Sequence, residues 1–178
     1  IVPPLHIKDN LELSPGEYSI TIKGIEIARN ELMMGHHLAM KTGDVDEDIP
    51  GVDTVEPAFG LPAIWISEED EERAQFAGYT VVDLPTVLAT HLTEVLKNHA
   101  YEFVGRQETQ KLIDSHAETE PKVVEELIPS LLSLGVVQKV LQNLLKELVS
   151  IRDLHTILET LADISPITKD PDLLTEHV

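Results

Sequence analysis

The chain has 178 residues, with 13 Lys and Arg against 32 Asp and Glu, which gives a formal charge of −19. Nucleic-acid binding needs clustered bases that displace counterions, and the few bases here are spread out, so the composition excludes nucleic acid as a partner. The sequence has neither an apolar run long enough to cross a membrane nor the pattern of a signal peptide at its start. The absence of cysteine excludes disulfides, thiolate catalysis and cysteine-bound metal centres.

Alternating apolar positions predict β-strands in the first half of the chain. Residues 5–7, 18–23 and 25–28 have the period of two and the β-branched side chains of half-buried strands. Residues 79–82 form a further short strand. We therefore expect the first half to contain sheet structure.

Two helices are predicted in the same half. Ser67 is the expected N-cap of the first, because the three acids after it favour the positive end of the helix dipole, and Gly78 ends it. Asp83 is the expected N-cap of a second helix that runs to residue 104. Thr90 lies on a polar face of this helix and is available to a partner. Its apolar stripe is expected at Leu88, Leu92, Val95, Ala100 and Phe103.

The last third of the chain is predicted to be wholly helical. Pro121 opens one helix and Pro129 breaks it. The apolar stripe of the next helix is formed by Val137, Val140, Leu141, Leu144, Leu145 and Leu148. Only Val149 and Ser150 are expected to join it to the following helix, which starts with Ser150 and Asp153 in a capping-box-like pattern, and Asp170 caps a terminal helix.

Residues 44–72 contain eleven acids and no base, and they supply more than half of the net charge. The simplest interpretation is a solvated loop followed by a helix start. The run Asp44–Asp48 imitates a calcium loop but lacks the glycine and glutamate that such a loop requires. A metal-dependent enzyme that uses His36, His37 and this run is the alternative from another class of function. No hydrolase or phosphate-loop motif occurs, so we predict no catalytic residues, no metal site and no cofactor.

One segment has the features of a protein-docking element. Phe59 stands between Pro57, Gly60 and Pro62, and the prolines fix the backbone on either side of it. A ring that is held stiffly loses little entropy when a partner covers it. The alternative is that Phe59 and Trp65 fill a small core, and the residues alone leave both interpretations open.

Four segments resemble the FlhA family of type III export-gate proteins. They are EPAFGLPAIWI (56–66), GYTVVDLPTVLATHLTEVLKNHAYEFVGRQETQKLID (78–114), LQNLLKELVSIRDLHTILETLAD (141–163) and TKDPDLLTEHV (168–178). The motifs EPAFGLP and SIRDLHTILETLAD are similar to those of the flagellar branch of the family. The export gate of a virulence secretion system is the alternative.

The resemblance implies an α+β fold of several subdomains. The first subdomain is expected at 1–34 and 84–104, an inserted acidic α/β subdomain at 35–83, and an all-helical third subdomain at 105–178. A fourth subdomain and a transmembrane region are expected to lie outside this chain. The full-length protein is then expected to form a nonameric ring at the cytoplasmic face of the bacterial inner membrane, in the flagellar basal body, with membrane contact only through its N-terminal region.

The family's function is to dock flagellar export chaperones with their cargo, with components of the export ATPase complex as further partners and no enzymatic activity or cofactor. The acid, Phe and Thr of its chaperone site match Glu56, Phe59 and Thr90. The neighbours expected around them are Pro57, Leu61 and Val87, and the expected hinges between subdomains are Gly78 and Gly105.

Overall fold

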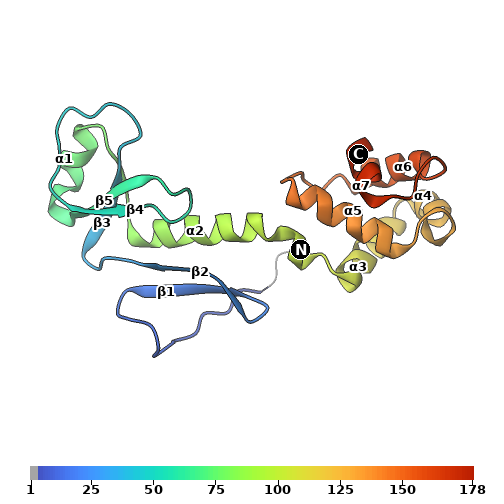
Figure 1. Cartoon of the computed structure of the whole chain (residues 1–178), viewed down its shortest axis with the longest axis horizontal. Coiled ribbons are helices and arrows are strands. Elements are labelled where there is room, and N and C mark those ends of the chain that lie inside the picture. The colour runs from blue at the N-terminus through green and yellow to red at the C-terminus, as the bar shows by residue number, and fades with distance from the viewer. Residues whose placement is uncertain (1–3) are drawn as a thin grey trace. The chain divides into compact units, whose positions relative to one another are not determined.

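The computed structural model describes residues 4–178 (Figure 1). These residues form two compact units, one made of residues 7–96 and the other chiefly of residues 97–178. All strands of the described residues lie in the first unit, and the second unit is helical, so the predicted α+β class is confirmed. The finer division of residues 7–96 into a first subdomain and an insert remains a prediction.

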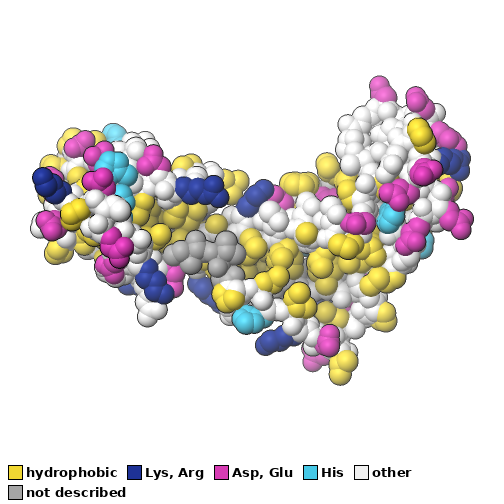
Figure 2. Space-filling model, turned by 180° about the vertical axis from the view of Figure 1, so that it is seen from behind, with side chains coloured by type: hydrophobic (Ala, Val, Ile, Leu, Met, Phe, Trp, Pro, Cys, Tyr) yellow, Lys and Arg dark blue, Asp and Glu magenta, His cyan; other side chains and the backbone are white. Residues whose placement is uncertain are grey.

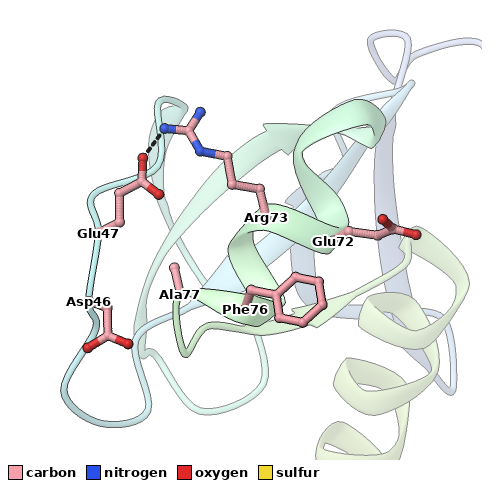
Figure 3. Close-up of a pocket in the computed structure, with 6 residues that line it drawn as sticks. All are labelled: Asp46, Glu47, Glu72, Arg73, Phe76 and Ala77. Carbon is pink, nitrogen blue, oxygen red and sulfur yellow. Dashed lines mark hydrogen bonds and ion pairs between the residues drawn. The ribbon is translucent and has the colours of Figure 1, made fainter.

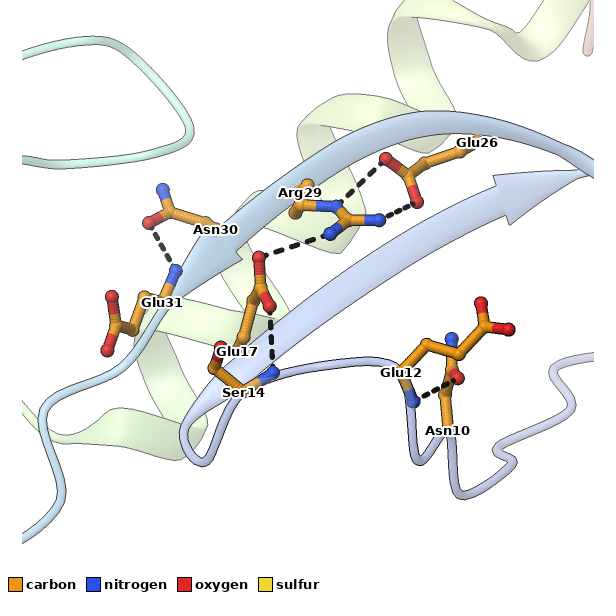
Figure 4. Close-up of polar contacts among 8 residues, drawn as sticks. All are labelled: Asn10, Glu12, Ser14, Glu17, Glu26, Arg29, Asn30 and Glu31. Atoms are coloured by element: carbon orange, nitrogen blue, oxygen red, sulfur yellow. Dashed lines mark hydrogen bonds and ion pairs between the residues drawn. The ribbon is translucent and has the colours of Figure 1, made fainter.

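The first unit begins with an antiparallel hairpin of β1 (Glu17–Ile22) and β2 (Ile25–Glu31). Lys23 and Gly24 both have positive φ, as the tight two-residue turn of a hairpin requires. Arg29 reinforces the pair, because its guanidinium donates hydrogen bonds to Glu26 at 3.0 and 2.9 Å and to Glu17 at 3.3 Å (Figure 4).

The predicted strands at 18–23 and 25–28 correspond to this hairpin and are confirmed. The strand predicted at 5–7 is wrong. These residues are irregular, and both Leu5 and Ile7 are exposed. In the first sheet β1 pairs with β2 alone, so the short alternating run at 5–7 has no partner strand there.

The second sheet is antiparallel, in the order β4-β5-β3-β6. Its strands are β3 (His36–Met40), β4 (Val52–Val55), β5 (Pro62–Ser67) and β6 (Thr80–Val82). Because Val55 lies opposite Pro62, residues 56–61 form the loop of a β4–β5 hairpin. Trp65 of β5 is buried beside Leu38 of β3 in the core under this sheet.

The predicted helix after Ser67 is confirmed as a 3-10 turn, η1 (Glu68–Asp70), that continues into α1 (Glu71–Phe76). Gly78 ends it with φ +96°. The amide of Gly78 donates to the carbonyl of Gln75 at 3.1 Å, and the amide of Tyr79 donates to that of Ala74 at 3.0 Å. This is the Schellman pattern that favours glycine at a helix C-terminus.

Asp83 is confirmed as the N-cap of α2 (Leu84–Asn98), since its Oδ1 accepts the amide of Thr86 at 2.9 Å. The helix ends six residues earlier than residue 104, and η2 (Ala100–Phe103) follows as a 3-10 turn. The predicted stripe is wrong in its first half. Val87, His91 and Val95 are buried, whereas Leu88 is exposed, because the face of α2 that packs includes a histidine bonded to β1.

The second unit is built from helices alone and its core is a single apolar cluster. The helices and turns are α3 (Arg106–Ala117), α4 (Pro121–Glu126), η3 (Leu127–Leu131), α5 (Leu134–Lys146), α6 (Leu154–Ile164) and α7 (Pro171–His177). Pro121 and Pro129 act as predicted, and Ile128 before Pro129 has extended angles. Asp170 is confirmed as the N-cap of α7.

The predicted two-residue joint between α5 and α6 is wrong. Residues 147–153 connect them, and Leu148 takes a positive φ of 60° where α5 has ended. The N-cap of α6 is Asp153, whose Oδ1 accepts the amide of Thr156 at 3.2 Å, and Ser150 lies outside the helix. An aspartate that satisfies a free N–H sets the start here, and the apolar stripe gives no signal of it.

Candidate functional site

The loop between β4 and β5, residues 56–61, presents Phe59 to solvent, with 60% of this residue exposed. Two backbone bonds close the loop. The amide of Glu56 donates to the carbonyl of Leu61 at 2.8 Å, and the amide of Gly60 donates to that of Glu56 at 2.9 Å. Gly60 has φ +69°, a conformation that glycine adopts without strain. The ring is therefore exposed on a backbone that is held in place.

Glu56 is buried, with only 4% of the residue exposed. Its carboxylate accepts the amide of Ala58 at 2.8 Å and the amide of Phe59 at 2.7 Å, one bond to each oxygen. Charge-assisted bonds of this length are among the strong ones in proteins. The side chain of Glu56 thus holds the backbone of Phe59, where the sequence predicted that it would face a partner.

The remaining residues of the predicted site differ in accessibility. Leu61 is exposed beside Phe59, whereas Pro57 and Thr90 are half-buried. Val87 is only 2% exposed and packs in the core cluster with Trp65. It holds α2 against the sheet that carries the loop and has no surface for a partner in this structure.

Tyr18 and His91 form a contact that the sequence did not predict. The hydroxyl of Tyr18 on β1 and Nδ1 of His91 on α2 are 2.7 Å apart; His91 is buried and Tyr18 is half-buried. Burial raises the pKa of Tyr18 to about 12, with the carboxylate of Glu56 adding to the rise. Burial lowers the pKa of His91, and Glu56 opposes this shift. The signal in the sequence was a histidine one turn after Val87 on the packing face.

The proposed hinge glycines have local roles. Gly78 occupies the left-handed position that ends α1, and a Cβ there would lie 3.1 Å from the carbonyl oxygen of Asp44. Gly105 is the N-cap of α3, with a negative φ of −88°. A hinge role for either remains a prediction.

The residues of the metal hypothesis are not brought together. No group of three His, Cys, Asp or Glu side chains that could hold a metal ion occurs within residues 4–178. His36 Nδ1 bonds the carbonyl of Met34 at 3.0 Å, and His37 Nδ1 lies 3.3 Å from a carboxylate oxygen of Glu71. Asp48 pairs with Lys41 at 2.7 Å. Over the same residues, no helix is long and apolar enough to cross a membrane.

The fold has counterparts among solved structures. Chlamydia pneumoniae CdsV is 28% identical, with a TM-score of 0.82 over 95% of this chain and 48% of that one. Nonameric EPEC SctV-C is 26% identical, with a TM-score of 0.67 over 91% of this chain and 49% of that one. The fold is thus that of the α+β modules of these two proteins, and in this chain it carries the Phe59 loop braced by Glu56.

The family model for the FHIPEP family matches residues 1–178, and the chain belongs to this family. The flagellar biosynthesis protein FlhA of Bacillus subtilis (strain 168) is 54% identical over 177 residues, which are 99% of this chain and 26% of that protein. The chain therefore spans about a quarter of the length of this relative.

Proposed function

We propose that the chain is the part of a flagellar type III export gate that docks export chaperones with their cargo, and that Phe59 is the anchor of the docking site. The observation that carries this proposal is the exposed ring on a loop braced by the buried carboxylate of Glu56. A rigid aromatic that is already in place is the typical centre of a protein interface. The alternative of core filling holds for Trp65, which is buried in the core, but is incompatible with the 60% exposure of Phe59.

The flagellar branch is supported by the 54% identity to a protein named for flagellar biosynthesis. The nonameric state of SctV-C supports a ring for the full-length protein of this family as well. We place the chaperone over Phe59 and Leu61, with Thr90 giving orientation through its hydroxyl. Glu56 acts from below by fixing the loop, and Val87 acts by fixing α2.

The contribution of Phe59 to the affinity for a chaperone can be worked out from the exposed fraction of this residue. Burying a fully exposed Phe side chain stabilises by about 1.5–3 kcal/mol, so covering the exposed 60% of Phe59 contributes about 1–2 kcal/mol. This corresponds to a loss of about 5- to 30-fold in affinity when the ring is removed.

The test is isothermal titration of the chain with a flagellar export chaperone, cargo-loaded and empty, for the wild type and Phe59→Ala. Phe76→Ala is the matched control, because Phe76 is also an exposed phenylalanine of residues 7–96. Circular dichroism confirms that all three chains are folded. A loss of about 5- to 30-fold in affinity for the loaded chaperone in Phe59→Ala, with unchanged affinity in Phe76→Ala, supports the proposal. Equal binding by all three refutes Phe59 as the anchor.

A further inference from the structure

The same unit carries a second exposed aromatic that the proposed docking site does not use. Phe76 is the last residue of α1 and is 86% exposed, the ring standing on the surface of the helix. Single exposed apolar residues are normal on protein surfaces, but Phe76 also lines a depression together with acidic side chains. Phe76 shares no residue with the Phe59 loop, so the two features can be tested apart.

Phe76 lines an open depression of about 450 Å³ with Asp46, Glu47, Glu72, Arg73 and Ala77 (Figure 3). A second depression of about 380 Å³ lies beside it and is lined by Glu72, Gln75 and Phe76. Asp46 and Glu47 come from the loop between β3 and β4, and Glu72 comes from α1. We call the six residues of the first depression the Phe76 surface.

The acidic loop of this surface is held in place. The amide of Asp46 donates to the carbonyl of Ala77 at 3.0 Å, and Arg73 pairs with Glu47. On either side of this stretch, Val45 packs on the core cluster and Ile49 is buried in it. The acidic loop is therefore in place before any partner arrives, which lowers the entropy cost of binding.

Charge decides what kind of partner fits. Arg73 is engaged by Glu47, whereas within residues 4–178 neither Asp46 nor Glu72 forms an ion pair. Acidic side chains gather over this unit (Figure 2). Cationic side chains of a partner would be attracted to the carboxylates of Asp46 and Glu72 while an apolar neighbour packs on the ring of Phe76.

We propose that the Phe76 surface binds a basic, partly apolar segment of a partner protein, in which an apolar side chain packs on Phe76 and Lys or Arg side chains meet Asp46 and Glu72. The same surface of a second copy is disfavoured as the occupant, because two surfaces that both carry Asp46 and Glu72 repel each other. Anionic lipid is repelled for the same reason. The inference goes beyond chaperone docking at Phe59 and does not depend on it.

The test follows the fluorine NMR resonances of the chain labelled with fluorophenylalanine. The chain has three phenylalanines, Phe59, Phe76 and Phe103. The probes are three capped peptides of the sequences GRLKRLG, GRSKRSG and GELEELG. We expect GRLKRLG to shift the Phe76 resonance and to leave the Phe59 resonance in place. The basic polar peptide binds more weakly, and the acidic peptide does not bind.

Phe76→Ala, which lacks the reporting resonance and is compared with the wild type by isothermal titration, is expected to weaken GRLKRLG binding at least about fivefold, as loss of a central aromatic contact does. Phe59→Ala leaves this binding unchanged, so failure here is distinct from failure of chaperone docking. Asp46→Asn with Glu72→Gln weakens the binding and reduces its dependence on salt. All three variants change exposed or half-exposed side chains, and circular dichroism checks their folding.

Several results overturn the proposal. The first is that GRLKRLG causes no saturable shift up to about 1 mM, a concentration at which even very weak binding is detected. The second is that the acidic peptide binds equally well. The third is that the Phe59 resonance shifts and the Phe76 resonance does not. Sedimentation that shows self-association of the wild type, lost in Phe76→Ala, would assign the surface to a second copy and would equally overturn it.

Discussion

Replacing Glu56 tests whether a buried carboxylate braces the Phe59 loop. The Glu56→Ala substitution removes both acceptors, which receive the amides of Ala58 and Phe59 at 2.8 and 2.7 Å. Hydrogen bonds to charged groups contribute about 1.5–3 kcal/mol each, but water reaches the freed amides of this exposed loop and the cost of burying the charge is relieved. We expect a net loss of about 2 kcal/mol in the free energy of unfolding.

Glu56→Gln keeps one acceptor oxygen and one bond, so it should lose about half as much. Urea unfolding followed by tryptophan fluorescence measures both changes, because Trp65 is the only tryptophan and is buried in the core under the same sheet. Asp53→Asn on β4 is the control, since an exposed acid changes stability by less than about 0.5 kcal/mol. A Glu56→Ala chain as stable as the wild type would refute the brace.

Two further predictions concern residues around the site. Because burial lowers the pKa of His91 from its ordinary 6.5, the unfolded chain takes up the proton first as the pH falls. Stability that is present above pH 6.5 is then lost as the pH falls below it, and His91→Gln should flatten this slope in urea titrations at several pH values. Gly78→Ala places a Cβ 3.1 Å from the carbonyl oxygen of Asp44 at a φ of +96°, so we expect a loss of about 1–2 kcal/mol. Thermal unfolding measures it against Gly105→Ala, whose Cβ meets only the flexible end of Glu108; equal losses would contradict the strain at Gly78.

Local signals predicted most helix starts and ends correctly. Asp83, Asp170 and Pro121 mark helix starts through chemistry within one turn, and Gly78 marks an end in the same way. The two-residue joint at Val149 failed, because an apolar stripe does not show where a helix stops winding.

The missed features depend on residues far apart in the chain. His91 is buried because it bonds Tyr18, 73 positions earlier, and no local pattern shows that pairing. Likewise, the acidic segment around Glu56 predicts an exposed side chain at this position. Glu56 is buried because its carboxylate accepts two amides of its own loop in the folded β4–β5 hairpin. The exposure of Phe59, which the residues left open, is decided by the same hairpin.

The most direct test of docking at Phe59 observes its ring during binding. Titrating fluorophenylalanine-labelled chain with a cargo-loaded flagellar chaperone should shift or broaden the Phe59 resonance and leave those of Phe76 and Phe103 in place. A complex that forms while the Phe59 resonance stays unchanged would contradict the account.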